Sequence, residues 1–550
     1  MPILKDMTTL TQSYLNSLAN QTFNVTTDYT MNGATLIFNG ITLNFNGGTI
    51  SNGTMYLNNC TLTGTMSHSI DANVEGTMTN STINSSWFTR IGRMRFDFSN
   101  KTIDFDENAT ILNEDDTVKI DHANHAVFDG HNKVFTCYAN FFEIYDDCNY
   151  IEIRNFKATA VGASVYQEDS LPVISFLKMG TRLNYQTLQR TYLNIHHNVI
   201  NKFNVGISLG ADEGTRIEYS NIYYNHIIET VGTEHGYGYG IHLANAYNCQ
   251  VYSNYIEKTT RHAIYHAWGT NNSIYSNIIK WHWKGVIEGV VNPGCQPSAA
   301  IGNVRAAIAI YRHSEYIEVK NNSFFDSYNA SIHIHSFPDS SFNGTSYGII
   351  DNITIENNFF QNTIIHDSSD GYHEHKYPAI FIGFPLQYCD YDYYSDIDNN
   401  NCYIDKVDII NNRLVCLNSD YTNFCRLYQC KHPNIENNEI TFSACSIISG
   451  TLVCRLINLD TANLSYSVGM TANIKNNVFR NTNNQLPVNV EMSVFSNVSD
   501  LFSSNYIVTI QNNTLYNQVL NGIQMYQLYY NYVASTDTSS HPNFNLQLES

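Results

Sequence analysis

Residues 351–363 read DNITIENNFFQNT, and this short stretch decides the fold. Ile353 and Ile355 alternate with polar residues, as expected for a strand with one buried face. Asn357 and Asn358 come next, and asparagine favours tight corners because it tolerates the left-handed backbone conformation. Two phenylalanines then begin a second strand. The stretch therefore predicts a strand, an Asn corner and another strand in close succession.

The same phrase recurs along the chain. Its corners fall at Asn322, Asn412, Asn438, Asn477 and Asn513, with looser copies at Asn198, Asn225, Asn254 and Asn277. A fixed phrase at elastic spacings of about 20–50 residues indicates a repeat architecture. Many corners are followed by a further apolar run, such as VGISL at 205, YGIHL at 239 and PAIFIG at 378. Each repeat is thus predicted to hold three short strands and a variable loop.

Three short strands per repeat leave no room for the crossover helices of an ordinary parallel sheet. A parallel β-helix solves this problem, because each coil pairs with the coils above and below it at ~4.8 Å. Parallel crossovers are overwhelmingly right-handed. We therefore predict an all-β protein, a right-handed parallel β-helix solenoid whose corner asparagines stack in a column.

The sequence divides into three predicted regions. Residues 1–90 form an N-terminal capping and attachment region, residues 91–515 the parallel β-helix, and residues 516–550 a last coil and polar tail. Apolar residues at helical spacing between 6 and 20 predict a short amphipathic helix that caps the open first coil. Residues 31–86 contain strands broken by Asn-Gly, which is compatible with hairpins or with short early coils.

Composition limits the partners. Acidic residues number 49 and basic residues 29, which gives a formal charge of −20 and argues against nucleic acid. The N-terminus has no long apolar stretch, so we expect no signal peptide, no membrane insertion and synthesis in a host cytoplasm. The twelve cysteines are expected to be reduced core residues, and no cofactor is expected.

The repeated I-x-I-x-N-N-x-F phrases followed by G-I-x-L resemble the right-handed β-helix repeats of the pectate-lyase-like superfamily. FNGITLNFNGGTISNG, followed by SSWF at 85–88, is similar to segments that precede the β-helix in phage tailspikes, especially those of gut Bacteroidetes (crAss-like) phages. The resemblance implies a homotrimeric virion protein of the phage tail that binds a bacterial surface polysaccharide, with depolymerisation left open. It also implies contacts with other tail proteins through the N-terminal region.

Aligning the strands that follow the corners predicts two rows of side chains. The outward row contains Ser208, His242, Tyr265, Ile287, His333 and Phe381. His266 and Glu288 interrupt the next, otherwise aliphatic, row. A glutamate beside a histidine is a candidate catalytic pair, because burial and neighbouring charge shift pKa values. The alternative is a locally turned strand that carries two ordinary surface residues.

Residues 258–284 contain basic and aromatic residues but no acidic residue. Aromatic rings stack against sugars, and cations meet their carboxylate or sulfate groups. We therefore expect this segment to contact glycan, the alternative being scatter over a solvated face. With the outward row, the predicted binding residues are Arg261, Trp268, Trp281, Trp283, Lys284, His242, Tyr265 and His333.

Two enzyme mechanisms are compatible with these residues. Glycoside hydrolysis needs two carboxylates, for which Glu229 and Glu257 are candidates. A lyase needs a base and a cation, which His262, His266, Arg261 and Lys284 could supply. In the insertion after Asn358, Asp390, Asp392, Asp396 and Asp398 offer oxygen ligands for calcium, without the spacing of an EF-hand loop.

Three functions remain open from the sequence. The first is a tailspike-like protein that binds a bacterial surface polysaccharide, with its depolymerisation left open. The second is a non-catalytic structural or adhesin subunit of the tail. The third is a bacterial polysaccharide lyase or glycoside hydrolase, which is disfavoured because such enzymes usually carry an export signal.

Overall fold

The computed structural model describes most of the chain. The described residues are 8–145, 148–161, 173–179, 188–210, 215–232, 237–280, 286–287, 290–291, 306–327, 330–335, 350–361, 378–383, 404–416, 424–428, 430–443, 446–448, 451–460, 471–482, 488–495, 506–517, 529–533 and 544–549. They fall into two compact units: unit 1 is Met1–Ser164 with Ser170–Ile227, and unit 2 is Val165–Asp169 with Ile228–Ser550.

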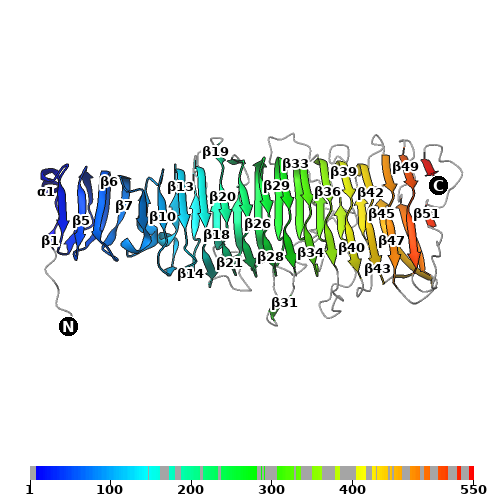
Figure 1. Cartoon of the computed structure of the whole chain (residues 1–550), viewed down its shortest axis with the longest axis horizontal. Coiled ribbons are helices and arrows are strands. Elements are labelled where there is room, and N and C mark those ends of the chain that lie inside the picture. The colour runs from blue at the N-terminus through cyan, green and yellow to red at the C-terminus, as the bar shows by residue number, and fades with distance from the viewer. Residues whose placement is uncertain are drawn as a thin grey trace, which may run out of the picture. The chain divides into compact units, whose positions relative to one another are not determined.

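Unit 1 is a stack of parallel coils (Figure 1). Strand β13 (Asn124–Asp129) pairs in parallel with β16 (Asn149–Arg154), and β16 pairs with β20 (Asn194–His196). On a second side of each coil, β14 (Val134–Cys137) pairs in parallel with β17 (Lys157–Ala160). Successive coils therefore pair through strands on at least two sides, which is the predicted right-handed parallel β-helix.

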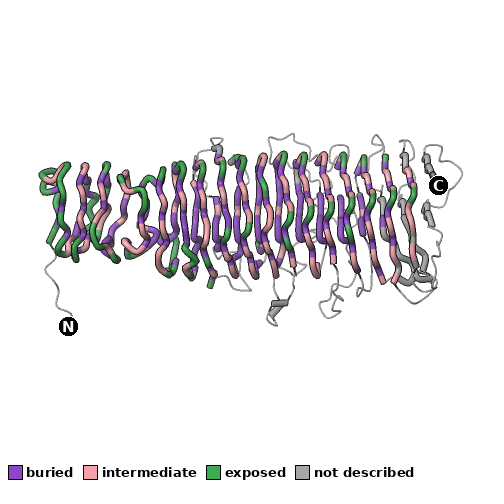
Figure 2. Tube along the Cα trace, viewed as in Figure 1, coloured by how far each residue is buried: buried purple, intermediate pink, exposed green. Residues whose placement is uncertain are grey.

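Unit 2 repeats this arrangement. Strand β36 (Ile350–Glu356) lies between β33 (Ile308–Lys320) and β39 (Ile404–Ile410), parallel to both. After its corner, β37 (Phe359–Gln361) pairs with β40 (Arg413–Cys416). Along these strands, buried apolar residues such as Ile353, Ile355 and Phe360 alternate with residues that are mostly half-buried or exposed (Figure 2). Period-2 alternation thus sets which side chains form the core.

The corner asparagines form the predicted column. In unit 2 it runs through Asn254, Asn277, Asn322, Asn358, Asn412, Asn438, Asn477 and Asn513. Each side-chain oxygen accepts hydrogen bonds from the amide nitrogen and the side-chain nitrogen of the preceding asparagine; Asn358 Oδ1, for example, lies 2.9 and 3.1 Å from these atoms of Asn322. Asn198 and Asn225 make the same contact in unit 1. The repeated phrase is therefore a hydrogen-bonded ladder.

The predicted N-terminal cap is present but shorter than expected. Helix α1 spans Gln12–Ser17 rather than residues 6–20, with Thr11 as its N-cap. Leu15 is buried, whereas Tyr14 is exposed. The Gln12 side chain donates to the Ile37 carbonyl oxygen at 2.9 Å and accepts from the Ile37 amide at 2.8 Å. A side-chain amide thus replaces a missing strand at the edge of β4 (Thr35–Asn39).

Residues 31–86 are early coils rather than hairpins. Strand β4 pairs in parallel with β6 (Ile50–Thr65), and β6 pairs in parallel with β7 (Ile70–Met78). Seven described cysteines are buried, as predicted for core residues: Cys60, Cys137, Cys148, Cys249, Cys416, Cys425 and Cys430. The predicted boundaries at residues 90 and 515 remain predictions.

Candidate functional site

Most of the predicted outward row is present in unit 2. Strands β26 (Tyr239–Tyr247), β29 (Ile264–Tyr275), β33, β35 (Ile332–His335) and β38 (Ile380–Ile382) pair in parallel. Their register places the following residues side by side in order: His242, Tyr265, Ala309, His333 and Phe381. In the next coil, β41 (Cys425–Tyr428) places Arg426 beside Phe381. A row of rings therefore ends in a guanidinium group.

The prediction that Ile287 and Glu288 belong to these rows is wrong. Val286 and Ile287 pair in antiparallel fashion with Val290 and Val291, so they form a separate two-stranded sheet. The strand that follows Tyr265 in the row is β33, and its Ile310 lies beside His266. The position assigned to Glu288 is thus taken by an aliphatic residue, and Glu288 itself lies outside the described residues.

Rings from the row and from its flanks form one cluster, here called the ring cluster. It consists of Tyr239, His242, His262, Tyr265, Tyr311, His333, His335 and Phe381. Tyr239 and Tyr265 are nearly parallel with centroids 5.3 Å apart, and His262 stacks against both. His242 stacks on Tyr265 at 5.1 Å. These four rings form one end of the cluster.

Tyr311 connects this end to the other. Its ring packs edge-on against Tyr265 and His333, with centroids 5.4 and 5.2 Å apart. Its hydroxyl oxygen lies 2.9 Å from His333 Nδ1, and His333 stacks on Phe381. Together these contacts hold the ring cluster in a fixed geometry.

Only part of the ring cluster reaches the surface. His262 and His333 have no exposed surface, whereas Tyr239, His242 and Tyr265 are half-buried. His262 Nδ1 lies 2.9 Å from the Ala306 carbonyl oxygen, which holds this ring in place. The Arg261 guanidinium lies over the Tyr239 ring at 5.3 Å from its centroid. A ligand would therefore meet Tyr239, His242, Tyr265 and Arg261 first.

His266, predicted as a catalytic residue, lies in the core. It has no exposed surface, and Asn272 Nδ2 donates a hydrogen bond to its Nε2 at 2.9 Å. Its Nδ1 lies 3.2 Å from Ser314 Oγ. Burial, with a smaller contribution from His242, lowers the pKa of His266 to about 3, so the ring is neutral at neutral pH. This environment is that of a structural histidine.

Trp268, predicted to contact glycan, is only 5% exposed and packs with Ala244, Ala267 and Tyr265. Its buried side chain packs against Tyr265 and offers little surface to a ligand. Three other predicted binding residues, Trp281, Trp283 and Lys284, lie outside the described residues. The same holds for the calcium candidates Asp390, Asp392, Asp396 and Asp398.

The two predicted catalytic glutamates are held by neighbours. Glu229 is 8% exposed, and its Oε1 lies 3.7 Å from Lys258 Nζ. Glu257 accepts a hydrogen bond from the Tyr255 hydroxyl at 3.1 Å. Glu229 directly follows β25 (His226–Ile228) and Glu257 ends β28 (Tyr255–Glu257). These strands come straight after the corner asparagines, whereas most of the ring cluster lies on the next strands along each coil.

Sequence reasoning missed Tyr239, Tyr311 and His335. Tyr311 and His335 lie two residues after the row positions Ala309 and His333, and they pair with each other. They end the runs IAIY and IHIH, which alternate like the other strands. The histidine and tyrosine content of these runs was a usable signal. Among the described residues, no helix is long and apolar enough to cross a membrane.

The arrangement combines flat rings, ring nitrogens, phenol groups and two guanidinium groups along one face of unit 2. Rings offer surface for the C–H faces of sugars, and guanidinium groups bind carboxylates. The row of His242, Tyr265, Ala309, His333, Phe381 and Arg426 contains no acidic residue. The site is therefore suited to a saccharide that carries negative charge.

No protein-family model matches this sequence, and no curated protein matches it. The solved structures that match this chain resemble it in fold. The catalytic domain of a GH87 alpha-1,3-glucanase in complex with nigerose is 13% identical, with a TM-score of 0.38, over 86% of this chain and 67% of that chain. The enzymatically active domain of bacteriophage CBA120 tailspike protein 2 is 12% identical, with a TM-score of 0.39, over 65% of this chain and 48% of that chain.

A mutant tailspike protein of E. coli bacteriophage HK620, in complex with a pentasaccharide, is 8% identical. Its TM-score is 0.43, over 72% of this chain and 61% of that chain. The match thus spans about half of the CBA120 domain and less than two thirds of the HK620 chain. The chain is a right-handed parallel β-helix protein. Among solved structures, its neighbours of similar fold include phage tailspikes.

Proposed function

We propose that this chain binds an acidic polysaccharide of a bacterial surface through the ring cluster. One observation carries the proposal: the half-buried rings Tyr239, His242 and Tyr265 from two successive coils lie together, with the Arg261 guanidinium over Tyr239. The same row of strand positions continues through buried side chains to Arg426. The rings are rigid because they stack on one another, so little conformational entropy is lost when a sugar binds. The two arginines add charge complementarity to a net acidic protein.

The setting of this activity is a phage tail. Support comes from the sequence phrases shared with tailspikes, including FNGITLNFNGGTISNG. In that setting the N-terminal region attaches to other tail proteins, and the assembly is a homotrimer. A mass measurement in solution tests the trimer, and a monomeric mass would contradict it.

A depolymerase is the second candidate, favoured by the position of His262 next to Arg261. In β-elimination a base removes the C5 proton of a uronic acid, a C4–C5 double bond forms and the O4-linked sugar leaves. Arg261 would neutralise the carboxylate of the uronic acid that loses its C5 proton. His262 is fully buried, so this chemistry requires the ring to become accessible when substrate binds.

Replacing surface groups of the ring cluster tests the binding proposal. We expect Tyr265→Ala to weaken binding of purified host capsule about tenfold, because a well-placed aromatic contact contributes about 1.4 kcal/mol. Arg261→Gln should weaken it similarly and reduce its dependence on salt. Affinity electrophoresis in gels that contain the capsule measures both effects.

Tyr56→Ala is the matched control, since Tyr56 is 45% exposed on β6 in unit 1 and should leave binding unchanged. Unchanged affinity in both ring-cluster variants would overturn the proposal. Product analysis separates the candidates: unsaturated sugars indicate elimination, new reducing ends indicate hydrolysis, and intact capsule that stays bound indicates binding alone.

A further inference from the structure

A second aromatic surface lies in unit 1, on the strands that precede the corner. Strands β13, β16, β20 and β24 (Asn221–Tyr223) pair in parallel over four coils. Near the N-terminal ends of these strands, four rings from successive coils stack on one another: His125, Tyr150, Tyr192 and Tyr219. Successive centroids lie 4.4, 4.6 and 5.3 Å apart, with planes within 15° of parallel. This stack is here called the tyrosine ladder.

The tyrosine ladder is exposed and its backbone is strained. Tyr150, Tyr192 and Tyr219 are 45%, 39% and 44% exposed. All four residues have φ between +51° and +56°, the left-handed region that a bulky side chain adopts only at a cost in free energy. Solvent-exposed rings therefore occupy positions where the backbone disfavours them.

Unit 2 shows what this position requires structurally. At the same place in the repeated phrase it carries Asn248, Asn271, Tyr316 and Asn352, all with positive φ. Asparagine adopts this conformation readily, so the corner itself needs no ring. The backbone alone thus gives no reason for four aromatic residues in unit 1, and strain of this kind often marks a functional surface.

Aromatic residues also occupy left-handed positions at the C-terminal ends of these strands. His197 and Tyr224 have φ of +55° and +51°, and Tyr224 is 54% exposed. The equivalent positions of unit 2 include Asn321, Asn357 and Asn411. Aromatic side chains consequently line both edges of one sheet face in unit 1.

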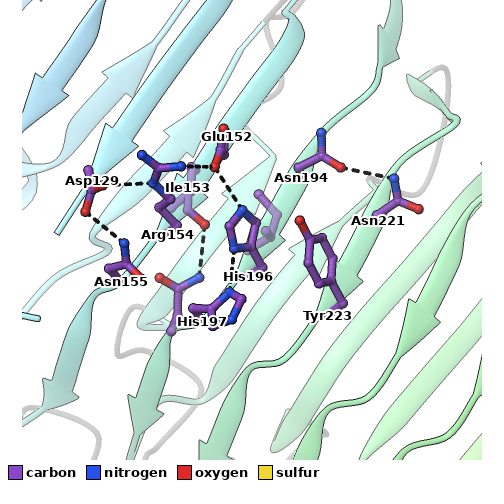
Figure 3. A network of polar contacts seen from close by, with 12 residues as sticks. Asp129, Glu152, Ile153, Arg154, Asn155, Asn194, His196, His197, Asn221 and Tyr223 are labelled. Atoms are coloured by element: carbon purple, nitrogen blue, oxygen red, sulfur yellow. Dashed lines mark hydrogen bonds and ion pairs between the residues drawn. The ribbon is translucent and has the colours of Figure 1, made fainter. Parts of the chain in front are cut away.

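Between these edges lies a fixed network of planar polar groups (Figure 3). Arg154 Nε lies 2.8 Å from Asp129 Oδ2, and its Nη1 lies 2.6 Å from Glu152 Oε1. Glu152 Oε1 is also 3.0 Å from His196 Nε2, and His196 stacks on Tyr223. These groups bond to one another, and the one guanidinium offsets the charge of one of the two carboxylates. The remaining negative charge disfavours an acidic sugar at this face.

Two further polar contacts lie on or beside the same strands. Asn221 Nδ2 donates to Asn194 Oδ1 at 3.0 Å, and His196 Nδ1 lies 2.7 Å from His197 Nδ1 (Figure 3). Burial lowers the pKa of His196, and the contacts with Glu152 offset only part of this effect. The side chains of Glu152, Asn194, Asn221 and Tyr223 are half-buried, whereas His196 is buried. Amide, carboxylate and phenol groups are thus accessible at fixed spacings.

We infer that this face of unit 1 is a second saccharide-binding site, which takes a neutral, hydroxyl-rich oligosaccharide. Amides and carboxylates bind sugar hydroxyl groups, and tyrosine edges offer rigid amphipathic contact area at low entropic cost. The coils repeat every ~4.8 Å, so an extended glycan meets the same groups repeatedly. Tyrosine and arginine are also common in protein interfaces, but the carboxylates Asp129 and Glu152 at the centre of this face disfavour a protein partner, because acidic residues are depleted there.

The decisive variant replaces the ladder without disturbing the corner. Tyr150→Asn, Tyr192→Asn and Tyr219→Asn are combined in the full-length protein, because asparagine is the residue that unit 2 uses at this position. Tyr316→Asn, which removes a single 52% exposed tyrosine from the corresponding position of unit 2, is the matched control. Thermal unfolding should show that both variants fold.

The probe is an array of immobilised neutral and acidic oligosaccharides from bacterial capsules and O-antigens. We expect the triple variant to lose at least tenfold in affinity for a set of neutral glycans, and the control to lose none. Asn194→Ala should weaken the same set. The inference does not depend on the ring cluster, because Tyr265→Ala should leave this set unchanged.

Two results would overturn the inference. One is that wild type and triple variant give the same signals on every glycan, including no signal at all. The other is that the triple substitution changes the assembly mass and leaves glycan binding intact, which would assign the face to a contact between protein chains.

Discussion

Asn358→Ala should lower the free energy of unfolding by about 4 kcal/mol, the largest effect expected of any single substitution described above. Asn358 is 1% exposed. Its side chain donates to the Val319 carbonyl oxygen at 2.8 Å and to Asn412 Oδ1 at 3.0 Å, and accepts from Asn322. Alanine would leave a buried carbonyl and a buried amide without partners, each at about 1–3 kcal/mol.

The neighbouring residue supplies the matched control. Asn357 is exposed, with φ of +55°. Asn357→Ala makes the same chemical change without breaking the ladder, so only the left-handed backbone should cost free energy, about 1 kcal/mol. Denaturant unfolding of the two variants measures the difference. Equal losses would show that the ladder contributes nothing beyond the corner conformation.

Acidification from pH 7 to pH 5 should destabilise the protein by about 4 kcal/mol through two buried histidines. Burial lowers the pKa of His266 and of His335 from 6.5 to about 3. Between these values the unfolded chain binds protons that the folded chain does not. Stability is therefore fully present above pH 6.5 and is lost as the pH falls, by about 2 kcal/mol per histidine at pH 5.

His266→Gln tests this expectation, because an amide can meet Asn272 and Ser314 without titrating. The variant should lose about 2 kcal/mol less than wild type between pH 7 and pH 5, as measured by denaturant unfolding at each pH. The same pH dependence in both proteins would mean that His266 is not the buried neutral group described above.

The fold could be predicted from sequence because its main determinant is a repeated phrase. Asn322, Asn358 and Asn412 each end an alternating strand, and a ladder of corners follows from their recurrence. The early coils could not be distinguished from hairpins, since Asn-Gly suits a turn in either arrangement. Pairing over long sequence distances decided that question.

The site was predicted only in part, for two physical reasons. Residues 281–305 separate Tyr265 from its true neighbour Ala309, so the nearest apolar run, which contains Ile287, was wrongly placed in the row. The tyrosine ladder was missed because Tyr150 and Tyr192 look like ordinary exposed strand residues. The corner sets their left-handed backbone conformation. An aromatic residue gives no sequence signal for that conformation, unlike asparagine or glycine.

Hydrogen–deuterium exchange of the full-length protein, with and without purified host capsule, tests the ring-cluster proposal most directly. Binding at the ring cluster predicts slower exchange in peptides that cover residues 237–267 and 306–313, with a smaller change for Arg261→Gln at the same capsule concentration. Capsule that binds while exchange in these peptides stays the same would contradict the proposal.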